Sequence, residues 1–166
     1  LNRAVAKDPK NADANNALGV LAIKENKEAD AQVFFKRALQ GNDDHPEANA
    51  NLGTYYLKYM DYDKAVMFLE KAYDHDKKNV TVANNYAVAL RGTGKLDEAM
   101  GIYKSIESRA KSQTMLNEAI LLSEYKKDFK EAKDILNKIR FISTDPAVLK
   151  KVNALMSKMD QQQPKK

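Results

Sequence analysis

A 34-residue internal repeat is the feature that most limits what this chain can fold into. Leu18-Gly19 is followed one period later by Leu52-Gly53, and a further step of 34 residues reaches Tyr86-Ala87. Self-similarity at a period of this length is typical of chains in which one supersecondary unit is copied and stacked on the next. A single unit of this size cannot bury its own apolar face, so the copies are expected to share a core with their neighbours.

Each repeat contains two amphipathic stretches joined by a short turn. Small and large apolar residues recur at helical spacing in the second stretch, and the fourth unit is one residue out of step. These residues are Ala31, Phe35 and Ala38; Ala65, Leu69 and Ala72; Ala99, Tyr103 and Ile106; and Ala132, Leu136 and Ile139. The turns are predicted at residues 25–27, 59–61, 92–94 and 126–128. Each unit is therefore predicted to be a pair of antiparallel helices.

This pattern resembles the tetratricopeptide repeat family, in which a Leu-Gly pair and an aromatic on the first helix precede Ala, an aromatic and Ala on the second. The resemblance implies an all-α fold, a right-handed α-solenoid (superhelix) of antiparallel hairpins with a C-terminal capping helix. The fourth unit departs from the pattern, because Ala119-Ile120 stands where Leu-Gly is expected and Ser123 stands where an aromatic is expected. One continuous domain is expected, divided into the end of a truncated preceding helix (1–10), three repeats (11–45, 46–79 and 80–112), a degenerate fourth repeat (113–144), the capping helix (145–160) and a disordered tail (161–166).

The two ends of the chain support this division. Leu1, Ala4 and Pro9 match the end of a second helix, so a hairpin is expected to be cut at the start of the chain. Asp145-Pro146 begins a helix with a single apolar stripe, which is expected to cover the last hairpin. The stripe consists of Val148, Leu149, Val152, Leu155, Met156 and Met159. A docking role for this helix, including self-association through an uncovered Met156 and Met159, is the alternative.

The first helices of the hairpins are predicted to line a groove that binds another protein or a peptide. The resemblance implies this location, and the helical period selects the residues that face the groove. The predicted groove residues are Asn16, Val20, Lys24, Asn51, Thr54, Leu57, Lys58, Asn84, Asn85, Val88, Arg91, Asn117, Leu121 and Tyr125. Asparagine is a poor residue for a helix interior, so its repetition indicates that the side chain is used.

A carboxamide has both donors and acceptors, and it can pair with the N–H and C=O groups of an extended peptide. Asn51 and Asn85 hold equivalent places in successive repeats and resemble the asparagine row with which several family members hold a ligand backbone. The alternative is that these residues cap helices or bridge adjacent repeats. Asn15 and Asn49 are also candidates for that structural role.

The sequence contains no recognisable catalytic machinery, and an enzyme is not expected. The chain has no cysteine, and its two histidines, His45 and His75, are predicted to lie in surface loops beside acidic residues, where a weak metal site is disfavoured. Residues 91–95 lack the spacing of a phosphate-binding loop. No metal, cofactor or small-molecule substrate is therefore predicted.

The net charge of +5 is concentrated in the C-terminal third. Residues 1–108 contain 15 Lys and Arg against 16 Asp and Glu, whereas residues 109–166 contain 13 against 7. Lys and Glu alternate along the helices there, so a solvated helical face is favoured over a surface for nucleic acid or anionic membrane. Membrane contact is expected only indirectly, because no apolar run is long enough to span a bilayer. The compartment is left open, either cytoplasmic or periplasmic if the chain is bacterial.

The leading functional prediction is a non-enzymatic protein-interaction scaffold or adaptor that holds a peptide or partner protein in the concave groove. One alternative is an architectural subunit or regulatory segment of a larger complex, such as a bacterial cell-envelope or motility assembly, that uses convex or terminal surfaces. A further alternative is binding of an anionic nucleic acid or membrane by the basic C-terminal third, which would be strongly salt-dependent.

Overall fold

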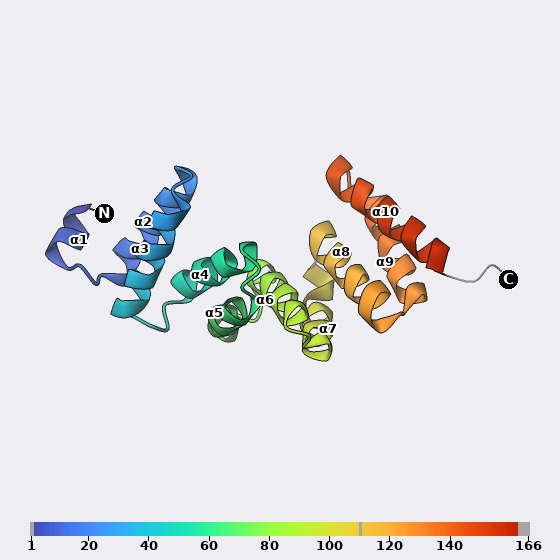
Figure 1. Cartoon of the computed structure of the whole chain (residues 1–166), viewed down its shortest axis with the longest axis horizontal. Helices are drawn as coiled ribbons and strands as arrows, with labels where there is room; N and C mark the ends of the chain where they lie inside the picture. Colours follow the sequence, from blue (N-terminus) through green and yellow to red (C-terminus); the bar gives the residue numbers. More distant parts are fainter. Residues whose placement is uncertain (1, 110, 163–166) are drawn as a thin grey trace. The chain divides into compact units, whose positions relative to one another are not determined.

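The computed structural model describes residues 2–109 and 111–162, and every regular element among them is a helix. The chain divides into two compact units, Leu1–Thr93 and Gly94–Lys166, called here the first and the second unit. The boundary falls in the turn predicted for the third hairpin. The alternation of helices and short turns follows the predicted repeat, and the chain is all-α as expected (Figure 1).

The first unit consists of sequential antiparallel helices. It contains α1 (Asn2–Lys7), α2 (Ala12–Lys24), α3 (Glu28–Gly41), α4 (Pro46–Lys58), α5 (Tyr62–His75) and α6 (Val80–Gly92). The helices α2 and α3 pack as one pair and α4 and α5 as the next, and α6 packs on α5 (Figure 1). Contacts between α3 and α4 join the two pairs. Each pair therefore buries its apolar face partly within itself and partly against its neighbour.

The second unit contains the remaining helices. These are α7 (Leu96–Ile106), the short 3₁₀ helix η1 (Glu107–Arg109), α8 (Ser112–Ile120), the π-helix η2 (Leu121–Lys126), α9 (Phe129–Ile142) and α10 (Pro146–Gln162). The helix α8 packs on α9, and α10 contacts both of them. The last helix extends two residues beyond the predicted boundary at residue 160, and residues 163–166 of the predicted disordered tail lie outside the described residues.

The starts of three helices are capped at the repeat period. Asn11 accepts a hydrogen bond from the Ala14 N–H at 2.8 Å, and His45 accepts through Nδ1 from the Ala48 N–H at 3.3 Å. Asn79 accepts from two backbone N–H groups at the start of α6, at 3.1 and 3.2 Å. Capping side chains satisfy backbone donors that have no partner within the helix. The 34-residue spacing of the caps explains why α2, α4 and α6 begin at equivalent positions.

The turns inside the hairpins also repeat, with one residue in each held in the left-handed region. Asn26 (φ 59°), Met60 (φ 57°) and Gly94 (φ 80°) lie 34 residues apart, and Lys127 (φ 58°) follows 33 residues later. A left-handed residue after the last helical turn reverses the chain and closes the helix end. All four positions lie within turns that the sequence predicted.

The fourth hairpin differs from the others at the end of its first helix. The α-helical hydrogen bonds of α8 change to the wider π-helix η2, and the Asp128 N–H donates to the carbonyl of Leu122 across the turn at 3.0 Å. Ser123, which stands in place of an aromatic residue, is buried and bonds the carbonyl of Ile120 at 3.2 Å. The degenerate sequence of this repeat thus coincides with a local change in helix type.

The Leu-Gly pairs allow close contact between the two helices of a hairpin. A Cβ atom on Gly19 would lie 2.4 Å from the ring of Phe35, and a Cβ atom on Gly53 would lie 2.6 Å from the side chain of Leu69. Both distances are far below van der Waals contact, so glycine is required for α2 to reach α3 and for α4 to reach α5. Phe35 and Leu69 are themselves almost completely buried.

The apolar stripe of α10 is buried in the core of the second unit. Val148, Val152, Leu155 and Met159 pack with apolar residues of α8 and α9, and Met156 lies partly buried against them. Met159 is only 1% exposed. This is the packing that a capping helix requires, and it leaves little of the methionine pair uncovered for self-association. None of the helices in the described residues combines the length and the apolar character needed to cross a bilayer.

Candidate functional site

Most of the predicted groove residues lie on three helices of the first unit. α4 contacts both α2 and α6, so its side chains can meet those of either neighbour. The predicted residues on these helices are Asn16, Val20 and Lys24 on α2; Asn51, Thr54, Leu57 and Lys58 on α4; and Asn84, Asn85, Val88 and Arg91 on α6. These three helices form the candidate groove of the first unit.

A row of polar side chains crosses the groove from helix to helix. Asn51 donates from Nδ2 to Oδ1 of Asn16 at 2.9 Å, which joins α4 to α2. Asn85 donates from Nδ2 to Oγ1 of Thr54 at 3.1 Å, which joins α6 to α4. Within α6, Asn84 donates to Oδ1 of Asn85 at 3.3 Å. These five residues are called here the amide row.

The amide row bridges adjacent repeats, which was the alternative to ligand contact. The bridging does not exhaust the hydrogen-bonding capacity of the row, because a carboxamide has two donor hydrogens and an acceptor oxygen with two lone pairs. Asn51 uses one hydrogen on Asn16, and it is half-buried rather than sealed in the core. The row therefore both holds the repeats together and presents polar groups at the surface of the groove.

Asn15 and Asn49, which lie one repeat apart, have a different role. Asn15 donates from Nδ2 to the carbonyls of Pro9 and Asn11 at 2.9 and 2.8 Å. Asn49 donates from Nδ2 to the carbonyls of Asp43 and His45 at 2.9 and 3.0 Å. Both side chains are buried, so they fix the loop before the helix and take no part in a surface site.

The groove contains a pocket of about 220 Å³ beside the amide row. It lies between the α2–α3 hairpin and α4. Its lining is mainly apolar, and the residues that line it are Ile23, Glu28, Phe35, Asn51, Thr54, Tyr55 and Lys58. An apolar pocket with a few polar groups at its edge is the usual form of a binding site for a side chain or small group.

Several apolar side chains on the three helices of the candidate groove are exposed or only partly buried. Val20 is 37% exposed and Ile23 is 43% exposed, although both belong to a helix that packs on α3. Leu57 and Val88 are partly buried on α4 and α6. Single exposed apolar residues are common, but several of them on one face that also contains a pocket indicate an interaction surface.

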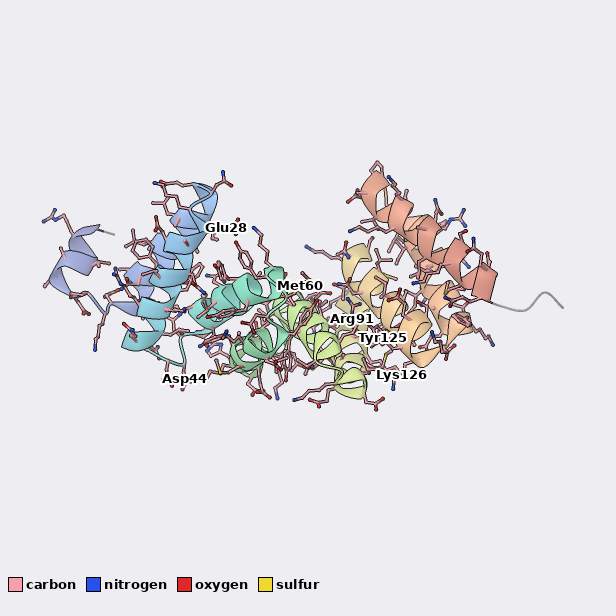
Figure 2. All side chains as sticks on the ribbon, in the orientation of Figure 1. Glu28, Asp44, Met60, Arg91, Tyr125 and Lys126 are labelled. Atoms are coloured by element: carbon pink, nitrogen blue, oxygen red, sulfur yellow. The ribbon has the colours of Figure 1, made fainter. Side chains whose placement is uncertain are left out.

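Glu28 forms an ion pair at the edge of the pocket. Its carboxylate accepts hydrogen bonds from Lys58 Nζ and, at 2.8 Å, from the Tyr59 hydroxyl. Glu28 is labelled in Figure 2. The bond from Lys58, followed by that from Tyr59, lowers the pKa of Glu28 below its ordinary value. The bond to Glu28 raises the pKa of Tyr59 to about 12. Because the negative charge of Glu28 balances the positive charge of Lys58, this edge of the groove is polar without a strong net charge.

Three predicted groove residues belong to the second unit. Leu121 is fully buried, so it has no surface with which to contact a ligand. Asn117 is half-buried and accepts a hydrogen bond from Gln113 at 3.2 Å, whereas Tyr125 is 50% exposed at the end of η2. Leu121 is the first residue of η2, and η2 contacts both α7 and α9, which accounts for the burial of this side chain.

His45 is not the exposed loop residue that the sequence suggested, because it is only 6% exposed. Its Nδ1 accepts the Ala48 N–H, so the proton of the neutral ring lies on Nε2, which is 3.0 Å from Oδ1 of Asp13. His75 is the last residue of α5. Within the described ranges 2–109 and 111–162, no three His, Asp or Glu side chains are grouped in a way that could hold a metal ion.

Four residues that line the pocket, Ile23, Glu28, Phe35 and Tyr55, are absent from the groove set predicted from the sequence, although Phe35 was predicted as a core residue of the repeat. Ile23 lies one repeat before Leu57, so the 34-residue spacing could have identified it. Glu28 lies on a second helix, and a search confined to first helices could not have found it. Tyr55 has no aromatic counterpart one repeat away, because Leu21 and Ala89 occupy the equivalent positions. The repeat pattern therefore could not predict that Tyr55 lines the pocket.

The stacked hairpins define a helical-repeat protein of the α-solenoid class. A family model described as tetratricopeptide repeat matches residues 56–120, from the end of α4 to the end of α8. For this part of the chain, the match confirms the resemblance to the tetratricopeptide repeat family found in the sequence. Such repeats generally mediate protein–protein interactions and are typically non-catalytic. No curated protein sequence matches the chain.

Solved structures with the same fold are similar to this chain at low sequence identity. MamA of strain AMB-1 has a TM-score of 0.69 at 21% identity, over 83% of this chain and 78% of that one. PilF of Pseudomonas aeruginosa has a TM-score of 0.73 at 19% identity, over 97% and 78%. A thermophilic tetratricopeptide repeat protein of Thermus thermophilus, TTC0263, has a TM-score of 0.65 at 19% identity, over 93% and 92%. These similarities confirm the fold class.

Proposed function

We propose that the chain is a non-enzymatic protein-interaction module whose first unit binds a peptide segment of a partner protein across α2, α4 and α6. The observation that carries this proposal is the apolar pocket that lies directly beside the amide row. A side chain of the peptide would enter the pocket, and the carboxamides would pair with its backbone N–H and C=O groups. This combination suits an extended segment with at least one apolar side chain.

The groove is suited to a peptide rather than to a small molecule because its contacts are spread along three helices. Val20 and Ile23 lie on α2, Leu57 on α4 and Val88 on α6, so an occupant must be long enough to reach several repeats. Backbone pairing through carboxamides demands little of the ligand sequence. Selectivity would therefore come mainly from the side chain that fills the pocket.

The substitution Ile23→Glu tests this proposal, because it places a carboxylate in the wall of the pocket beside Glu28. Val33→Glu is a matched control, since Val33 is 45% exposed on α3, Ile23 is 43% exposed, and Val33 does not line the pocket. Peptides selected from a random-sequence display library on the unmutated chain provide the ligands. We expect Ile23→Glu to weaken their binding, measured by calorimetry, by about tenfold or more, which corresponds to about 1.4 kcal/mol.

Val33→Glu should leave the affinity unchanged, and circular dichroism should confirm that both variants remain helical. If the selected peptides bind the Ile23→Glu chain as tightly as the unmutated chain, the groove of the first unit is not the binding surface. Such a result would favour a partner that binds the second unit.

The second candidate function is an architectural subunit that contacts a neighbour through the second unit. Phe141 is 93% exposed and Ile142 is 55% exposed at the end of α9. Two adjacent apolar side chains that are this exposed are unfavourable in water unless another surface covers them. Binding that survives Ile23→Glu and is lost on Phe141→Ser would favour this candidate.

A further inference from the structure

The second unit contains a polar pocket of about 450 Å³ that is separate from the groove of the first unit. It is bordered by α7, η1, α8 and α9, and α8 packs against both α7 and α9. The residues that line it are Lys104, Glu107, Glu118, Glu131, Asp134, Ile135 and Lys138. A pocket of this size admits a side chain together with several waters, each of which occupies about 30 Å³ in the liquid.

Glu118 on α8 is the unusual residue of this pocket. It is only 4% exposed, and within the described part of the chain it makes no hydrogen bond and no ion pair. Buried carboxylates are normally paired or hydrogen-bonded, because burial without a partner removes the hydration of the charged form. Glu118 therefore lines the pocket without a hydrogen-bond partner among the described residues.

The charges around Glu118 make the pocket negative. Its lining contains four carboxylates and two ammonium groups, so two negative charges remain when all of them are ionised. This is the reverse of the surrounding sequence, in which residues 109–166 contain 13 Lys and Arg against 7 Asp and Glu. The described side chains do not form a metal-binding group, so an organic cation fits the pocket better than a metal ion.

We propose that this pocket binds the guanidinium group of an arginine side chain presented by a partner protein. A guanidinium is planar and has five N–H donors, so it can bond Glu118 and a second carboxylate of the lining at the same time. It is also more weakly hydrated than an ammonium group, which favours its transfer to a buried carboxylate. The site belongs to the second unit and does not depend on peptide binding in the first.

The electrostatics of Glu118 support this assignment. The pKa of Glu118 is raised to about 6, mainly by burial and also by the neighbouring carboxylates of Glu107 and Glu131, while Lys104 and Lys138 oppose the rise. A bound guanidinium would favour the ionised form and so lower this pKa. The affinity should therefore increase as the pH rises through about 6. Asp134 also lines the pocket, and it is the remaining ionisable group that would face the ligand.

The experiment measures the binding of a capped Gly-Arg-Gly peptide to the full chain by nuclear magnetic resonance. The control ligand is the same peptide with citrulline, which has the shape of arginine but no charge. The test variant is Glu118→Gln, and the control variant is Glu98→Gln, which removes an exposed carboxylate of α7 that does not line the pocket. We expect saturable shifts of the pocket amides with the arginine peptide and no such shifts with the citrulline peptide.

Glu118→Gln should weaken the binding of the arginine peptide by about tenfold or more, and Glu98→Gln should not change it. In the unmutated chain, the midpoint of the Glu118 carboxyl titration should fall when the peptide is added. Equal binding of the two peptides, equal binding by the Glu118→Gln variant, or the absence of saturable binding would each overturn the proposal. The backbone spectrum of Glu118→Gln shows whether the variant is folded. A titration with free agmatine, an alkylguanidinium without a peptide backbone, shows whether the pocket recognises the guanidinium group alone or also requires the peptide.

Discussion

At the scale of single residues, the burial of Glu118 makes the stability of the protein depend on pH. The pKa of this carboxyl is about 6 in the folded state and 4.5 in its ordinary state. The folded chain therefore binds the proton more tightly, and the free energy of unfolding falls as the pH rises from about 4.5 to about 6. The loss is about 1–2 kcal/mol at neutral pH, because one pKa unit corresponds to about 1.4 kcal/mol.

Glu118→Gln should remove this loss, since a carboxamide is uncharged at every pH. We expect the variant to be more stable than the unmutated chain at pH 7.5 by about 1 kcal/mol, with little difference at pH 4. Urea denaturation at the two pH values measures this. Glu98→Gln, which changes an exposed carboxylate on α7, should follow the unmutated chain. The prediction would be contradicted if the free energy of unfolding changed with pH by the same amount in Glu118→Gln and in the unmutated chain.

At the scale of elements, the start of α4 depends on an unusual capping residue. Asn11, His45 and Asn79 cap α2, α4 and α6 at the same repeat position, and only the second of them is a histidine. Because the caps are equivalent, His45→Asn should preserve the stability of the chain to within a few tenths of a kcal/mol. His45→Ala should reduce it by about 1 kcal/mol, the usual cost of a lost N-cap.

Thermal unfolding of the two variants at pH 7.5 checks this expectation. A loss of stability in His45→Asn as large as that in His45→Ala would assign the main role to the contact between Nε2 of His45 and Asp13 instead of the cap. The comparison separates these roles, because asparagine restores the acceptor for the Ala48 N–H and cannot reproduce the ring.

At the scale of the whole molecule, a repeat protein is stabilised by contacts between neighbouring elements, so a core defect should have local effects. Met159 packs with apolar residues of α8 and α9 in the second unit. Met159→Asp should bury a carboxylate there and destabilise this unit by about 2 kcal/mol or more. Hydrogen exchange should become faster in α8 and α9 and stay unchanged in α2 to α5.

Ser157→Asp is the control for that experiment, because Ser157 is exposed on the same helix. It should leave exchange unchanged in both units. Equal acceleration of exchange in α2 to α5 by Met159→Asp would mean that the two units unfold together, contrary to the expectation.

Much of the fold could be predicted because the repeat acts locally. The positions of the turns at Asn26, Met60 and Gly94 follow from a 34-residue spacing, and the Leu-Gly pairs mark where two adjacent helices approach. The equivalence of Asn51 and Asn85 was also visible in that spacing, although the hydrogen bonds that these residues make to the preceding repeat were not. A period shows which residues are equivalent, but it does not specify the distance between side chains on different helices.

The sequence by itself thus determined the all-α hairpins and their turns, and it predicted which helices line the candidate groove. Only the tertiary structure separated the buried Asn15 and Asn49 from the amide row, brought Glu28 to the edge of the pocket, and enclosed Leu121 and Glu118. The physical reason is that helical periodicity and turn residues act over a few residues of chain. The burial and pairing of a side chain depend instead on groups that are far away in the sequence and meet only when the helices pack.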